Sequence, residues 1–210
     1  HQAGLLYEKN DLERAASMGE NAIEFVRILG ETYTLISGFE YLFWIRLSTG
    51  ADEETVLSPL SEMEDLSVYC SRARPLAGAL RIRYLLCRYP GNAEILQRAF
   101  ALAEQYGLWF KKAQPGEDQP HPVPFERRMQ LKEQLNLMRL YLAEARIPSV
   151  AGPRMSMQEA VECLGVLLSE SRQEDIGEYE IEALILLAMA YELLRDDENA
   201  INTLRRAVCM

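Results

Sequence analysis

The fold is decided by residues 181–210, which read IEALILLAMAYELLRDDENAINTLRRAVCM. Apolar side chains in the first half recur at helical spacing, so they share one face of a helix. These side chains are Leu184, Leu187, Ala188 and Tyr191. The polar run 195–198 interrupts this pattern, and a second apolar face follows over residues 200–208. Two helices of similar length joined by a short polar turn are typical of an antiparallel helical hairpin.

The order of small and large residues in this hairpin matches the tetratricopeptide repeat (TPR). The matching positions are Leu187, Ala188, Tyr191, Ala200, Leu204 and Ala207. Arg195 stands where the repeat usually has a turn glycine. Asp196 or Asp197 is placed to cap the second helix, because a carboxylate there can accept from the free amides of the first turn. The pattern predicts a helical repeat scaffold, and it does not name a ligand.

The same pattern, in weaker form, extends over the rest of the chain. Long helices are expected over residues 31–48, 75–89 and 125–146, and a capping-box spacing at Ser156 and Glu159 begins another. We therefore predict an all-α fold of about ten helices in about five hairpins, stacked as a right-handed TPR-like superhelix. Residues 1–210 are expected to form one repeat domain that is part of a longer protein and can associate with itself through apolar end faces.

Two segments break the even array of helices. Residues 108–124 contain four prolines, which forbid a regular helix, and residues 147–155 contain two prolines and a glycine. A loop as long as the first is either a mobile insertion or a functional segment. In the second case it would be a lid or partner contact with Trp109 and Phe110 as anchors.

Composition excludes several classes of protein. A net charge of −10 disfavours direct binding to nucleic acid or to anionic membranes, because both need a basic surface. The four cysteines are widely spaced, which indicates buried free thiols in a reducing cytoplasm rather than zinc or disulfides. No apolar run is long enough to cross a bilayer, and the sequence has no secretory signal pattern.

Catalytic and cofactor motifs are absent from the sequence. Its two histidines, His1 and His121, suggest no catalytic triad, and the sequence has no glycine-rich phosphate-binding motif. The acidic runs 52–54 and 196–198 lie at expected helix starts, where capping explains them. Glu178, Glu180 and Glu182 alternate along a helix, so they do not share a face for a metal. We expect no enzyme activity, no metal and no cofactor in this segment.

Four stretches together resemble the sensor region of large ATP-binding LuxR-type transcription regulators, the MalT-like family. They are AGLLYEKNDLERAASMGENAIE at 3–24, AFALAEQYGL at 99–108, FERRMQLKEQLNLMRLYLAEARI at 125–147 and IEALILLAMAYELLRDDENAINTLRRAV at 181–208. The resemblance covers nearly the whole chain. It implies a superhelix that in such regulators lies between an ATP-binding module and a DNA-binding helix-turn-helix, neither of which has a counterpart in this sequence.

The resemblance implies a sensory domain that binds a small-molecule inducer or a regulatory protein or peptide in the cytoplasm. DNA would be contacted only through the helix-turn-helix, and ATP only through the other module. The alternative is a general TPR scaffold that holds other proteins together. A Walker A motif upstream or a helix-turn-helix downstream would distinguish the two.

The expected binding surface is the concave side, which the first helix of each TPR hairpin lines. Alignment on Tyr141 and Tyr191 places Lys132, Leu135, Arg139 and Leu142 of one hairpin on this side, with Glu182, Ile185, Met189 and Glu192 of the next. A looser alignment of residues 76–89 adds Tyr84 and Arg88. Such a mixture of cations, carboxylates and apolar groups suits a peptide or a small polar molecule. The other interpretation is an ordinary solvated face.

Overall fold

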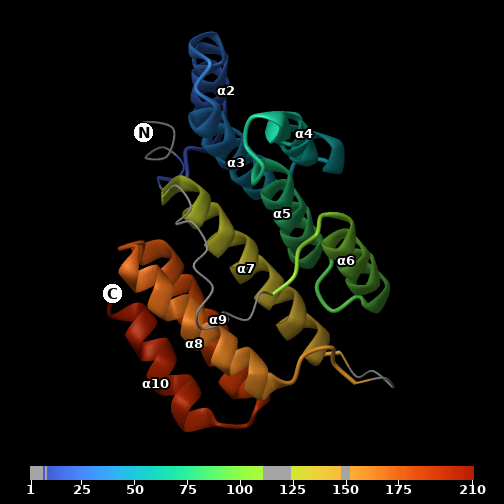
Figure 1. The fold of residues 1–210 in the computed structure, drawn as a ribbon, viewed down its shortest axis with the longest axis vertical. Helices are drawn as coiled ribbons and strands as arrows, with labels where there is room; N and C mark the ends of the chain where they lie inside the picture. The colour runs from blue at the N-terminus through green and yellow to red at the C-terminus, as the bar shows by residue number, and fades with distance from the viewer. Residues whose placement is uncertain (1–6, 8, 111–123, 148–151) are drawn as a thin grey trace. The chain divides into compact units, whose positions relative to one another are not determined.

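The computed structural model describes residues 7, 9–110, 124–147 and 152–210, and all of its regular secondary structure is helical. Figure 1 shows the helices in chain order. They are α2 (Leu12–Leu29), α3 (Thr32–Ser48), α4 (Glu53–Asp65), the 3-10 helix η1 (Leu66–Val68), α5 (Ala73–Arg88), α6 (Ala93–Gln105), α7 (Pro124–Ala145), α8 (Met157–Gln173), α9 (Gly177–Leu193) and α10 (Asp197–Val208). The predicted all-α, TPR-like fold is confirmed, and the long helices begin and end within two residues of the expected positions.

The chain forms two compact units, residues 1–77 and 78–210. In the first unit, α3 packs against both α2 and α4. The close approach of α2 and α3 depends on Gly38, because a Cβ atom there would lie 2.9 Å from Cγ1 of Ile23. Asp52 caps α4, where its Oδ1 accepts a hydrogen bond of 2.9 Å from the Thr55 amide.

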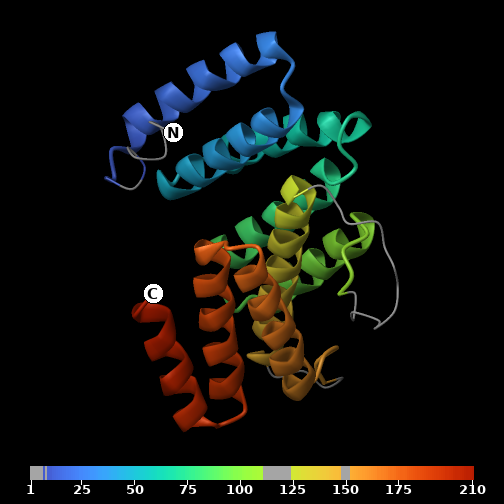
Figure 2. The same cartoon turned by 60° about the vertical axis from the view of Figure 1, so that its left-hand side comes forward.

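In the second unit, α7 packs against α6, α8 and α9, and α9 also packs against α8 and α10. Figures 1 and 2 both show α7, α8, α9 and α10 side by side. The contact between α7 and α9 joins the first helices of two successive hairpins, which is the packing that a TPR array requires. Leu131, Leu135, Met138 and Leu142 of α7 are all at most 1% exposed and form the core with α8 and α9.

Local capping follows the sequence closely. Ser156 and Glu159 form the expected capping box at the start of α8. Asp196 caps α10 by accepting from the Asn199 amide. Arg195, which stands where TPR turns usually have glycine, adopts a left-handed φ of 62°. The turn therefore keeps the repeat's conformation even though its residue departs from the repeat's preference.

Parts of the predicted irregular segments lie outside the described residues, namely 111–123 and 148–151. The described end of the first segment is Leu108, Trp109 and Phe110. The main-chain oxygen of Trp109 accepts a hydrogen bond from Gln134, and Phe110 packs against the core of the second unit. Whether this loop is a lid stays a prediction.

The prediction of buried free thiols is right for two cysteines and wrong for the other two. Cys70 and Cys163 are free and buried, whereas Cys87 and Cys209 are free and exposed. In the described part of the chain, no helix is long and apolar enough to cross a membrane.

Candidate functional site

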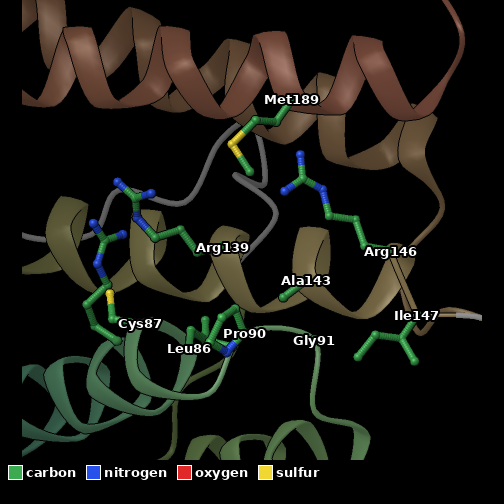
Figure 3. Close-up of a pocket in the computed structure, with 10 residues that line it drawn as sticks. Leu86, Cys87, Pro90, Gly91, Arg139, Ala143, Arg146, Ile147 and Met189 are labelled. Carbon is green, nitrogen blue, oxygen red and sulfur yellow. The ribbon is translucent and has the colours of Figure 1, made fainter.

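A cavity of about 460 Å³ opens between α5, α7 and α9, all within the second unit (Figure 3). From α5 and the turn that follows it, the cavity is lined by Arg83, Leu86, Cys87, Pro90 and Gly91. From α7, the residues just after it and α9, it is lined by Arg139, Ala143, Arg146, Ile147 and Met189. These helices are the first helices of three successive hairpins, which are the helices that the sequence analysis expects to line the binding surface.

The spacing of residues along α7 creates the space. Arg139, Ala143 and Arg146 follow at i, i+4 and i+7, so they lie on one side over about 10 Å of helix rise. Ala143 is the small residue between the two arginines, and Figure 3 shows Met189 reaching from α9 toward the same space. A longer side chain at residue 143 would project into the cavity.

An ion pair between α7 and α9 borders the cavity. Nε and Nη2 of Arg139 lie 2.9 and 2.6 Å from Oε1 of Glu182. The two side chains are 19% and 28% exposed, so water screens this pair less than a surface pair. Arg146 and Glu192 form a second, exposed pair at 3.1 Å. The first pair fixes the position of the Arg139 guanidinium at the cavity.

Glu182 lies in a cationic environment that is also poor in water. Burial raises the pKa of its carboxyl group, and the positive charges of Arg83 and Lys132 act in the opposite direction. Nζ of Lys132 lies 5.2 Å from the centre of the Tyr179 ring, within the range of a cation–π contact. Three cationic side chains, those of Arg83, Lys132 and Arg139, therefore act on this one carboxylate.

The residues predicted for the site are only partly brought together. Arg139 and Met189 line the cavity. Glu182 and Glu192 do not line it, but they pair with two arginines that do. Two further predicted residues, Tyr84 and Arg88, are not among the lining residues.

At the end of α5, burial explains why Tyr84 does not line the cavity. Tyr84 is 2% exposed and belongs to the core, so its side chain does not offer a binding surface. Arg88 is exposed at the last residue of the helix. Arg83, one residue before Tyr84, lines the cavity instead. Two residues of α5 that line the cavity, Arg83 and Cys87, therefore each lie one position before a residue that the looser alignment selects.

Sequence reasoning missed Arg83, Cys87, Ala143 and Arg146. On α7 it expected Leu135 and Leu142 on the binding surface, but both are buried in the core between α7, α8 and α9. The face that lines the cavity is the neighbouring one. A small residue between two arginines at i, i+4 and i+7 is the signal that could have identified this face.

The described residues include no group of three or more histidine, cysteine or acidic side chains that could hold a metal ion. What the cavity offers is guanidinium groups beside apolar walls. Such a site can bind and orient a ligand that has both polar and apolar parts.

Comparison with known proteins identifies the family. The family model described as the MalT-like TPR region matches residues 1–210. No curated protein and no solved structure matches the chain. Since the family model covers every residue and the described helices pack as TPR-like hairpins, the chain belongs to the MalT-like TPR region family.

Proposed function

We propose that this chain is the sensory region of a LuxR-type, MalT-like transcription regulator and couples the binding of an inducer to the activation of transcription. The ligand is a small molecule or a regulatory protein or peptide, bound in the cytoplasm. The segment itself has no catalytic role and holds no cofactor. ATP and DNA would be bound by other modules of such a regulator.

One observation carries this proposal: the cavity between α5, α7 and α9, which combines arginines with apolar walls. It is lined by the first helices of consecutive hairpins, so a ligand that fills it contacts several repeats at once. A ligand that binds one arrangement of these hairpins better than another shifts the population toward that arrangement. Such a shift is a physical route from binding to regulation.

The test is the inducer response of the intact regulator, measured with a transcription reporter. Arg139→Ala removes a cavity guanidinium and should weaken the response, while the helical content measured by circular dichroism stays unchanged. Arg172→Ala is the matched control. Arg172 also pairs with a glutamate of α9, Glu180, at 2.6 Å, but it does not line the cavity.

A normal response in a folded Arg139→Ala variant would contradict a sensing role for this cavity. The control variant should respond like the wild type. An equal loss in both variants would mean that stability, not binding, controls the response.

A general TPR scaffold is the second candidate. It is favoured by exposed apolar side chains on α10, namely Ile201, Leu204 and Val208. If glutamate at Leu204 abolishes the transcription response and Arg139→Ala does not, protein contacts through α10 are the main function, not ligand sensing.

A further inference from the structure

We propose that the cavity between α5, α7 and α9 binds a small organic anion, with its carboxylate or phosphate ester held by guanidinium groups and its apolar body on the cavity walls. This proposal rests on the proposed sensory function and names the chemical class of the inducer.

The charge of the lining is the first argument. Three of the ten lining residues are arginines, Arg83, Arg139 and Arg146, and none carries a carboxylate. The chain as a whole has a net charge of −10, so a lining whose charged side chains are all arginines contrasts with the overall composition. A concave site lined by charges of one sign concentrates the electric field, and this field attracts ligands of the opposite charge.

The geometry of Arg139 is the second argument. Its contact with Glu182 uses Nε and one N–H of Nη2. A guanidinium has five N–H donors, so Nη1 and the second N–H of Nη2 can still donate. Glu182 also holds the guanidinium in place, so less conformational entropy is lost when a ligand binds. The arginine is positioned before the ligand arrives.

The apolar walls of the cavity indicate that the rest of the ligand is apolar. Leu86, Pro90, Ala143, Ile147 and Met189 give the cavity an apolar surface. A cavity of about 460 Å³ lies within the range of small-molecule sites and is too small for a folded partner. The ligand is therefore an anion with an apolar body, and not a bare inorganic ion or a protein surface.

The test uses anilinonaphthalene sulfonate, a fluorescent aromatic sulfonate, with the full 210-residue chain. Its sulfonate stands in for the carboxylate or phosphate. N-phenylnaphthylamine, which has the same rings without the charge, is the neutral comparison. The sulfonate probe should bind at least about tenfold more tightly, which corresponds to one charge-assisted hydrogen bond. Equal binding of the two probes would overturn the proposal.

Three variants locate the binding and separate charge from shape. Arg83→Gln/Arg146→Gln removes two cavity charges, and Ala143→Leu fills the space with a residue that favours helix. Each should raise the dissociation constant of the sulfonate probe at least about tenfold. Arg205→Gln/Arg206→Gln makes the same charge change on α10, outside the cavity, and should leave the constant within about twofold.

Exposed Cys87 allows an independent measurement of ligand binding at the same site, because Cys87 lines the cavity. In a Cys209→Ser background, Cys87 is the one cysteine left exposed, since Cys70 and Cys163 are buried. The sulfonate probe should slow the alkylation of Cys87 by iodoacetamide in this background. The Ala143→Leu variant should abolish that protection.

Displacement of the probe then identifies the head group. Octanoate and octyl phosphate should displace it and octanol should not, and the better competitor distinguishes a carboxylate from a phosphate. Displacement by octanol alone, or variants that bind the probe like the wild type, would overturn the proposal. The sensory function would still stand if the reporter response depended on Arg139 for a neutral inducer.

Discussion

Gly78 shows at the scale of one residue how closely two helices pack. A Cβ atom on this residue of α5 would lie 2.3 Å from Cγ of Tyr106, at the end of α6. Because the conflicting atoms belong to the base of the tyrosine side chain, a rotation of its far end cannot relieve them. A glycine is therefore required here even though it weakens the helix.

Gly78→Ala should lower the free energy of unfolding by about 1–2 kcal/mol, since the steric cost exceeds the gain in helix propensity. Gly165→Ala in α8 is the control. There a Cβ atom meets no other element within 4 Å in the described part of the chain, so stability should rise by about 0.5–1 kcal/mol. Urea unfolding of both variants measures the difference, and equal effects of one sign would contradict the packing of Tyr106.

At the scale of elements, a largely buried carboxylate, that of Glu182, lies in the contact between α7 and α9. Burial raises its pKa in the folded protein above the ordinary value of 4.5. The folded state then binds more protons than the unfolded state as the pH rises above that value. The contribution of this group to stability is therefore full at low pH and is lost as the pH rises through its folded pKa.

This linkage predicts a pH-dependent difference between the wild type and Glu182→Gln. The free energy of unfolding of the wild type should fall relative to that of the variant as the pH rises from about 4 toward neutrality, because the glutamine does not titrate. Urea unfolding at a series of pH values measures the difference. A difference that grows in favour of the wild type over this range would mean that the ion pair with Arg139 outweighs burial.

The elements also show what could be predicted from the sequence and what could not. Caps such as Ser156 and the apolar spacing of α9 depend on residues within a few positions, so the sequence predicts them correctly. The cavity depends on which face α7 turns toward α5 and α9. Leu142 and Ala143 are neighbours, and only the packing of other helices places one in the core and the other at the cavity.

Gly19 illustrates the same limit for close helix contacts. Gly19 lies between Ala15 and Ala22, at a spacing of small residues that is common in close helix contacts, but a Cβ atom there meets nothing within 4 Å in the described residues. Gly38, which the pattern did not select, makes the close approach to Ile23 instead. Small residues mark possible contacts, and the partner helix determines which of them is used.

At the scale of the whole molecule, α10 carries exposed apolar side chains, and we expect them to pair with a second copy of the chain. Ile201, Leu204 and Val208 are 52%, 49% and 79% exposed, and their spacing of i, i+3 and i+7 places them in one stripe. Ala207, which lies between Leu204 and Val208 in the sequence, is 8% exposed and packs inward instead. The stripe is a continuous apolar surface, which favours association.

The charges of α10 favour an antiparallel pairing of two such stripes. Its first turn carries Asp197 and Glu198, and its last turn carries Arg205 and Arg206. If the twofold axis is perpendicular to the two α10 helices, they run antiparallel, and the acidic turn of each α10 faces the basic turn of its partner. The same pairing buries the apolar stripe between them.

We therefore predict a dimer whose dissociation constant rises at least about tenfold in Leu204→Glu, because the new charge would be buried against the partner's stripe. Val166→Glu is the matched control, since Val166 is 44% exposed on α8 and lies outside the stripe. Sedimentation equilibrium over a wide concentration range measures both constants. A wild-type chain that stays monomeric at the highest concentration, or a control that dissociates the dimer as strongly as Leu204→Glu, would show that α10 does not pair with itself.

Added salt should weaken the wild-type dimer as well, since the facing acidic and basic turns are exposed and their attraction is screened.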